Sequence, residues 1–366
     1  MDKSKFSITI LLFLYSFGLI ACTSAPHIVS PYNSIDWENY GQYKAALHAH
    51  TTNSDGRNLF YEVVEAHYDN DFDILAITDH NQVTVSWVSV NNGLSQLRAD
   101  QIARGDDRGG RGMLRVSYTN EQTLFNEHMN SFFTNWTTSD PNNNITSYVH
   151  SPEDILDQVE GLGGIAFYNH PSSRIVGYNN IHRINMYTRH FMDYSSLVGL
   201  EIINYRDDGS KGLDRRLWDK LLEQLIPQGR FIWGFSNDDS HENRQIGNSY
   251  NIFVMPENNI ENFQQAMMSG KFYAVARIAR IELGTDFVGS GPVPVIESIT
   301  INERTGSITI KAQNHERIDW ISNGEVITSG DSILLGTHKN KLGTYVRANI
   351  IGPGGIVFTQ PFGIIW

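Results

Sequence analysis

The chain has 366 residues, a formal net charge of −12 at pH 7 and one cysteine. A single cysteine leaves no pair for an internal disulfide, and an acidic chain is a poor general binder of nucleic acid, whose phosphates are contacted mainly by Lys and Arg. A large polynucleotide substrate is therefore disfavoured, and the composition is that of a soluble globular protein with room for more than one domain.

Residues 1–21 are typical of a lipoprotein signal peptide. Lys3 and Lys5 precede an apolar run over residues 6–20, which is shorter than the roughly 20 residues of a comfortable membrane span. The run ends Leu-Ile-Ala-Cys, which resembles a bacterial lipobox with Cys22 as the acylated first residue of the mature chain. We expect a cell-envelope lipoprotein anchored in the membrane through a lipid on Cys22. An ordinary secretory signal or an uncleaved anchor is the alternative.

Removal of residues 1–21 takes away two lysines and one aspartate, so the formal charge falls from −12 to −13. Residues 22–40 contain Ser, Pro and Asn with little periodicity. This composition predicts a tether between the lipid and the folded part of the chain.

Two histidines at positions i and i+2 open the folded part. In an extended strand such residues point to the same face, so His48 and His50 can converge on one cation while Ala49 packs on the other side. Asp55 follows five residues later. Imidazole is the commonest metal ligand in proteins, and we interpret this stretch as the edge of a metal site.

Three further groups of polar residues follow apolar runs that read as buried strands. His80 lies in Ile-Thr-Asp-His-Asn at residues 77–81, His170 follows the run at 163–168, and Asp239 and His241 follow the run at 231–235. Parallel α/β folds collect functional side chains at the carboxyl ends of their strands. The sequence therefore predicts that these groups meet.

The motifs resemble the polymerase and histidinol phosphatase (PHP) family of metal-dependent phosphoesterases. The matching pieces, in the family's order over about residues 43–275, are H-A-H-T-T-N-S-D-G at 48–56, I-T-D-H-N at 77–81, N-H-P at 169–171 and D-S-H at 239–241. The family also has a glutamate and a histidine between the second and third pieces, which Glu121 and His128 match. It usually has glycine two residues before that glutamate, where this chain has Thr119.

The resemblance implies an α/β fold, a distorted (β/α)7 barrel over residues 41–285, with two or three divalent ions at the carboxyl ends of its strands. It implies one ion held by His48, His50, Glu121 and Asp239. Glu121 would bridge to a second ion held by His128 and His170. Asp55, His80 and His241 would face a third position, at which many members have histidine in place of Asp55.

The residue types agree with this chemistry. Mixed imidazole and carboxylate ligands suit zinc, manganese or iron, and the lack of thiolates argues against a closed structural zinc site. Ions in an open site lower the pKa of a bound water to about 7, and a pair about 3.5 to 4 Å apart stabilises both oxygens of a displacement at phosphorus. Hydrolysis is the reaction we expect.

Several nearby residues are open to two interpretations. Asp79 either orients the His80 imidazole or caps a following helix. Arg174 either receives a phosphate oxygen or is a solvated loop residue. Glu201 and Asn204 end another apolar strand, which gives them a possible site role. For the arginine- and glycine-rich segment at 104–115, we favour a mobile loop. The alternative is that the segment binds a phosphate chain.

Residues 286–366 show only short strand-like runs separated by turns, which predicts a small all-β sandwich. The expected strands are 296–302, 307–312, 318–321, 332–335, 345–350 and 356–358. The sandwich either covers a face of the barrel or binds a glycan or partner through exposed aromatics such as Trp320. We favour the covering role, because aromatics in strands are more often part of a core.

The sequence thus predicts an exported metal-dependent phosphoesterase that acts on small phosphorylated substrates, with no protein partner. Asp55, His241 and Arg174 are the candidate catalytic residues. The alternatives are hydrolysis of a non-phosphate bond at the same centre, since fold does not fix substrate, and a non-catalytic binding lipoprotein.

Overall fold

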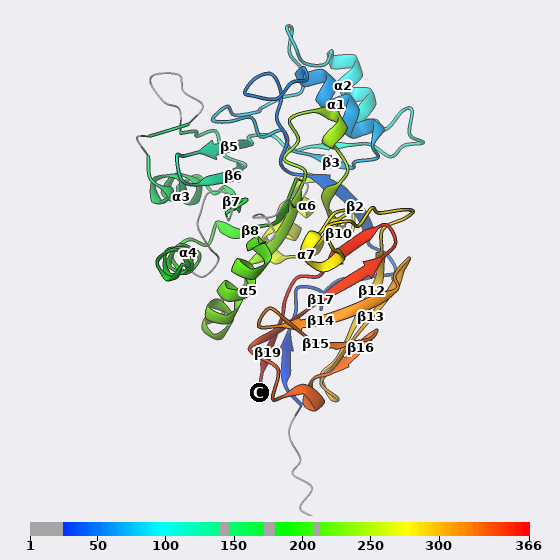
Figure 1. Cartoon of the computed structure of the whole chain (residues 1–366). Coiled ribbons are helices and arrows are strands. Elements are labelled where there is room, and N and C mark those ends of the chain that lie inside the picture. Colours follow the sequence, from blue (N-terminus) through cyan, green and yellow to red (C-terminus); the bar gives the residue numbers. More distant parts are fainter. Residues whose placement is uncertain (1–24, 139–145, 149, 172–179, 206, 208–212) are drawn as a thin grey trace, which may run out of the picture.

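The computed structural model describes residues 25–138, 146–148, 150–171, 180–205, 207 and 213–366 (Figure 1). The predicted signal peptide with Cys22, and Arg174, lie outside the described residues. Among the helices of the described ranges, none has the length and apolar character needed to cross a membrane. The fold is mixed α/β.

One long sheet runs through most of the molecule. Its strand order is β1-β19-β17-β18-β11-β10-β2-β3-β4, and β14 and β15 join it through β17. The bounds are β1 (His27–Val29), β2 (Gly41–Ala46), β3 (Ile74–Leu75), β4 (Leu114–Arg115), β10 (Ser249–Met255), β11 (Phe272–Ala276), β14 (Arg317–Ser322), β15 (Glu325–Ser329), β17 (Tyr345–Gly352), β18 (Gly355–Phe358) and β19 (Phe362–Ile365).

A second sheet has the order β5-β6-β7-β8-β9. Its strands are β5 (Asn120–Thr123), β6 (His128–Phe132), β7 (Ile165–Asn169), β8 (Leu197–Asn204) and β9 (Trp233–Asn237). Stacked phenylalanines join the two sheets: Phe235 lies 4.4 Å from Phe167 within the second sheet and 4.7 Å from Phe272 of the first, between ring centroids. This aromatic core fixes the strand ends of both sheets relative to each other.

Neighbouring strands are not all parallel, whereas the strands of a regular (β/α)7 barrel are. The pairs β2–β3, β3–β4, β7–β8 and β8–β9 are parallel, whereas β5–β6, β6–β7, β2–β10 and β10–β11 are antiparallel. The β5–β6 pair is a hairpin whose turn, residues 124–127, has no room for a helix. The α/β class is confirmed.

Seven helices occur in the described residues: α1 (Phe60–Asp69), α2 (Gln96–Arg104), α3 (Pro152–Gly161), α4 (Ile181–Asp193), α5 (Leu213–Leu225), α6 (Ile260–Ser269) and α7 (Arg280–Leu283). Helix α3 begins as its sequence predicts, because Ser151 accepts the backbone N–H of Asp154 and Pro152 occupies the first turn. Apolar residues of α3, α4 and α5 pack with β7 and β8 in one cluster (Figure 1).

The C-terminal region contains the expected strands, with β15 and β19 in addition. A three-stranded sheet of β12 (Val295–Asn302), β13 (Ser307–Gln313) and β16 (Ser332–Leu334) shares a core with β14 and β17. Trp320 is fully buried in this core, and its Nε1 donates to the carbonyl of Gly330 at 2.8 Å. Its side chain is therefore a core element and not an exposed binding aromatic.

The long sheet crosses the predicted boundary at 285/286, because β18 pairs with β11. The segment expected to be a tether also belongs to this sheet. His27–Val29 pairs with β19, Ile28 is fully buried, and the Tyr32 hydroxyl donates to the carbonyl of Phe272 at 2.9 Å. A tether is therefore wrong for these residues, since partners far along the chain order them.

The arginine-rich segment at 104–115 is packed rather than mobile. Arg111 places Nε and Nη2 at 2.6 and 2.8 Å from the carboxylate of buried Asp73. Arg108 donates to the carbonyl of Phe72 at 2.8 Å and lies over the ring of Tyr68. These guanidinium groups are engaged within the protein, which weakens the alternative that the segment holds a phosphate chain.

Candidate metal centre

The two histidines after β2 lie as the period-two pattern predicts. The N–H of His50 donates to the carbonyl of Ser240 at 2.9 Å, and the N–H of Thr78 donates to the carbonyl of Ala49 at 2.9 Å. These bonds hold the segment extended between two neighbours, so both imidazoles point to one side while Ala49 packs into the apolar core. Both rings are buried.

Glu121 lies at the middle of the centre. Its Oε1 is 2.8 Å from His128 Nδ1, 3.4 Å from His48 Nε2 and 3.5 Å from His170 Nε2. Its Oε2 is 2.8 Å from His80 Nδ1 and 3.4 Å from His50 Nε2. A single buried carboxylate therefore has imidazoles of four chain segments around it.

Asp239 closes the centre from the end of β9. Its Oδ1 lies 3.2 Å from His48 Nε2 and 3.1 Å from His50 Nε2, and its Oδ2 lies 3.9 Å from His170 Nε2. Two of these residues have positive φ angles, 47° for Asp239 and 27° for His170. Non-glycine residues adopt such angles at a cost, and strained residues of this kind cluster at functional sites.

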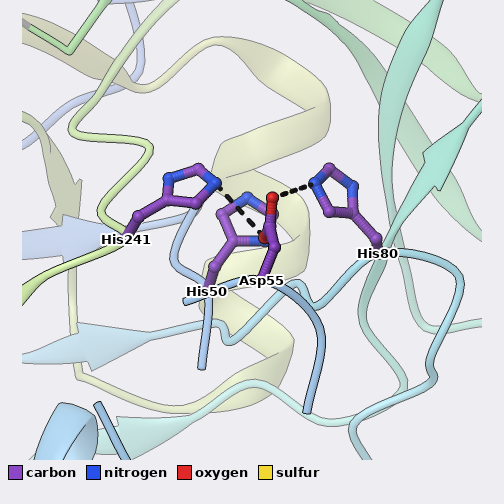
Figure 2. A group of neighbouring side chains, drawn as sticks. All are labelled: His50, Asp55, His80 and His241. Atoms are coloured by element: carbon purple, nitrogen blue, oxygen red, sulfur yellow. Dashed lines mark ion pairs between the residues drawn. The ribbon is translucent and has the colours of Figure 1, made fainter. Parts of the chain in front are cut away.

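Asp55 lies between three histidines on the open side of the centre (Figure 2). Its carboxylate is 3.3 Å from His241 Nε2, 3.4 Å from His80 Nε2 and 3.7 Å from His50 Nδ1. The side chains of Asp55 and His241 are 39% and 33% exposed, whereas those of His48 and His50 are inaccessible. Among these side chains, the centre is therefore exposed to solvent on the side of Asp55 and His241.

Ligand atoms within 4.8 Å of one another form four groups. They are His50, Asp55, His80 and His241; His48, His170 and Asp239; His48, His50 and Glu121; and His80, Glu121 and His128. The groups contain all nine predicted ligands. They place His80 beside Glu121 and His128, and His170 beside Asp239, so the pairing of His128 with His170 on one ion stays a prediction.

The residues present fit divalent metal ions. His48 Nε2 and His50 Nε2 are buried and make no hydrogen bond, although each lies 3.1 to 3.4 Å from carboxylate oxygens of Glu121 and Asp239. Buried polar atoms normally have a partner, and leaving them without one is costly. Convergent lone pairs of imidazole and carboxylate are the ligands of zinc, manganese and iron.

The carboxylates set the electrostatics. Burial alone raises the pKa of Glu121 and Asp239, but the surrounding imidazoles outweigh it and hold both well below their usual values. Burial lowers the pKa of His80 and His241, and their carboxylate partners more than compensate, raising them to about 10 and about 9. A metal ion bound to these imidazoles would displace their protons, because ligating histidines are neutral.

Glu201 supports the centre from β8. Its Oε1 lies 2.8 Å from His48 Nδ1, and its Oε2 accepts the backbone N–H of His170 at 2.9 Å. The amides of Asn237 and Asn204 donate to it at 2.8 and 2.9 Å. Strand-end position had suggested a role for Glu201 and Asn204, and the structure places both beside the ligands.

Asp79 neither orients the His80 imidazole nor caps a helix. Its carboxylate accepts the backbone N–H and hydroxyl of Thr51 and the hydroxyl of Ser54, all at 2.7 Å. It thereby fixes the loop that carries Asp55. The His80 ring is instead oriented by Thr123, whose hydroxyl lies 2.6 Å from Nδ1. Neither the sequence spacing nor a motif indicated Thr123.

The sequence also indicated no site role for Asn169, although this residue belongs to the N-H-P motif. Its amide donates to Glu121 Oε1 at 2.8 Å and to Asn130 Oδ1 at 2.9 Å. It therefore orients the central carboxylate. The signal in the sequence is that Asn169 directly precedes His170, a predicted ligand.

No family model matches the chain. Over 75 residues it is 39% identical to the DNA polymerase/3′-5′ exonuclease PolX of Bacillus subtilis, a match that covers 20% of this chain and 12% of that protein. The chain thus matches only a small part of that relative's length.

Two solved structures are similar at low identity. A two-domain protein from Bacteroides vulgatus, described as containing a predicted PHP-like metal-dependent phosphoesterase, is 14% identical with a TM-score of 0.47, over 91% of this chain and 89% of that one. The lesion-specific endonuclease EndoQ of Pyrococcus furiosus is 14% identical with a TM-score of 0.40, over 62% and 56%. At this low identity the chain is similar to one protein described as containing a predicted PHP-like metal-dependent phosphoesterase and to one lesion-specific endonuclease.

Proposed function

We propose that the protein is a metal-dependent phosphoesterase of the PHP family that hydrolyses small phosphate mono- or diesters, with its strands closed into a distorted barrel. The observation that carries the proposal is the convergence of buried imidazoles on Glu121 and Asp239, with lone pairs that no hydrogen bond uses. A binding scaffold does not need such a costly arrangement.

His48, His50, Glu121 and Asp239 would hold one ion, with His80, His128 and His170 completing the adjacent position. Zinc, manganese or iron would supply Lewis acidity and a nucleophilic water at neutral pH. Glu201, Asn169 and Thr123 keep the ligands oriented before substrate arrives.

His241 and Asp55 carry the proton chemistry on the open side. Asp55 Oδ1 lies 3.3 Å from His241 Nε2, so this carboxylate would accept a hydrogen bond from the His241 ring when the ring is protonated. A protonated His241 ring would attract the phosphate and donate a proton to the leaving oxygen. Arg174 would add a second positive group at the phosphate.

The direct test is release of p-nitrophenolate from p-nitrophenyl phosphate and from bis(p-nitrophenyl) phosphate after reloading with zinc, manganese or iron. We expect turnover of at least one ester, its loss in EDTA and its return with metal. Glu121→Gln should stay inactive after reloading. A protein that holds the metals but releases no p-nitrophenolate from either ester would favour hydrolysis of another bond, and one that holds no metal would favour a binding lipoprotein.

The envelope location is proposed from the lipobox alone. Metabolic labelling with a radioactive fatty acid should mark the wild type and not Cys22→Ser. Equal labelling of the two proteins, or none in either, would contradict a lipid anchor on Cys22.

A further inference from the structure

Two exposed aromatic side chains adjoin at the rim of the metal centre. Phe125 and Tyr148 are 57% and 66% exposed, and their ring centroids lie 5.6 Å apart with the planes tilted by 34°. Large apolar side chains exposed next to each other commonly mark a binding surface. The metal ligands and their supporting hydrogen bonds do not involve either ring.

The β5–β6 hairpin ties this pair to the centre. Its last paired residues are Thr123 and His128, so Phe125 lies in the turn between the residue that orients His80 and a predicted metal ligand. Phe125 is two residues from Thr123, and two residues of extended chain span at most about 7 Å. The turn therefore stays close to the metal centre. Ser147, the residue before Tyr148, donates its N–H to the carbonyl of Thr123 at 2.8 Å.

The turn is held in one conformation on both sides of Phe125. The N–H of Leu124 donates to the carbonyl of Glu127 at 2.9 Å, and both of these side chains are buried. Glu127 accepts the hydroxyl of Tyr187 at 2.8 Å and pairs with Arg183, both from α4. Phe125 is therefore presented outward by anchored neighbours, which lowers the entropy lost when a ligand binds it.

We propose that Phe125 and Tyr148 form a stacking platform for a planar aromatic ring carried by the substrate, such as a nucleobase or an aryl group, while its phosphate lies at the metal centre. This inference rests on the proposed function and narrows the substrate to phosphate esters that carry such a ring. Stacking on aromatic side chains tolerates any ring with an open face. Aliphatic phosphate esters would lack this contact.

The test compares two non-hydrolysable ligands on the metal-loaded full-length protein by calorimetry: 1-naphthylmethylphosphonate and methylphosphonate. The wild type should bind the naphthyl ligand at least about tenfold more tightly, as stacking of one ring predicts. Phe125→Ala and Tyr148→Ala should each remove most of that preference and leave methylphosphonate affinity unchanged. Tyr148→Phe keeps the ring and should keep the preference, as should Trp366→Ala, an exposed aromatic on the C-terminal residue.

Equal binding of the two ligands by the wild type would overturn the inference. So would a loss in Phe125→Ala that is the same for both ligands, because that indicates a structural role for the turn. The readout does not depend on turnover. A naphthyl preference in a protein that hydrolyses no phosphate ester would contradict the proposed function and leave the platform standing.

Discussion

Glu201 Oε1 lies 2.8 Å from Nδ1 of His48, and this contact decides which ring nitrogen faces the ligands. A carboxylate only accepts hydrogen bonds, so the proton is on Nδ1 and the Nε2 lone pair points at Glu121 and Asp239. Glu201 would thus act on a metal ion held there through the His48 ring.

Replacing Glu201 with Gln should weaken metal binding by about 10- to 100-fold, the usual cost of losing a hydrogen-bond partner of a ligating histidine. A metal titration followed by calorimetry measures it. Glu303→Gln, an exposed glutamate, is the control and should bind as the wild type does. Unchanged affinity in a folded Glu201→Gln protein would remove the orienting role.

Acid should destabilise the protein partly through His67, which is fully buried in α1. Burial lowers its pKa to about 4, and its Nδ1 donates to the carbonyl of Val63 at 2.8 Å. The folded state takes up this proton at a lower pH than the unfolded chain, so the contribution is complete above pH 6.5 and is lost as pH falls towards 4. The loss between pH 7.5 and 4.5 is about 2–3 kcal/mol.

Urea unfolding of the wild type and of His67→Leu at the two pH values measures this difference. The variant should lose less stability on acidification by about that amount, while all other titrating groups act equally in both proteins. An identical pH dependence would show that His67 does not titrate as its burial implies.

A buried ion pair joins α5 to the C-terminal strands. Arg347 places Nε and Nη2 at 2.8 Å from the two carboxylate oxygens of Asp219, and the Tyr345 hydroxyl donates to the same carboxylate at 2.7 Å. Removing one partner leaves a buried charge, so Asp219→Asn should cost about 3–5 kcal/mol of unfolding free energy. Denaturant titration measures it.

Arg104→Ala is the matched control, because its ion pair with Asp106 is exposed to solvent. This variant should unfold at the denaturant concentration of the wild type. A similar small effect for Asp219→Asn would mean that the α5 contact does not fix the C-terminal region.

The chain should not fold when it is cut after residue 285. Residues 274–276 of β11 pair with β18, and Phe358 and Val357 are fully buried. Truncation leaves a hydrophobic strand edge, which promotes aggregation. Size-exclusion chromatography and thermal unfolding test this expectation. A soluble monomer that unfolds cooperatively would show that the predicted boundary at 285/286 separates independent domains.

The clustering of the predicted ligands could be predicted from sequence because their signals are local. His48 and His50 share a strand face by period two, and His170 and Asp239 follow apolar runs whose ends meet in α/β folds. The α/β class and most C-terminal strands could also be predicted from patterns among residues close together in the sequence.

What the sequence did not reveal depends on contacts between distant segments. Glu201 is 153 residues from His48, and β1 is ordered by strand β19 at the other end of the chain. Thr123 is an ordinary strand residue until β5 places it beside His80. The sequence around His67 does not indicate burial, but the side chain is fully buried and Phe72 packs against its ring.

Metal content per chain is the most direct test of a multinuclear metal centre. Elemental analysis of the full-length protein, purified without chelator and reloaded, should find two or three equivalents of zinc, manganese or iron. His48→Ala and Asp239→Ala should lose at least one equivalent, since both residues face the same ion, and Glu303→Gln should lose none. Less than one equivalent in the reloaded wild type would contradict a multinuclear metal centre.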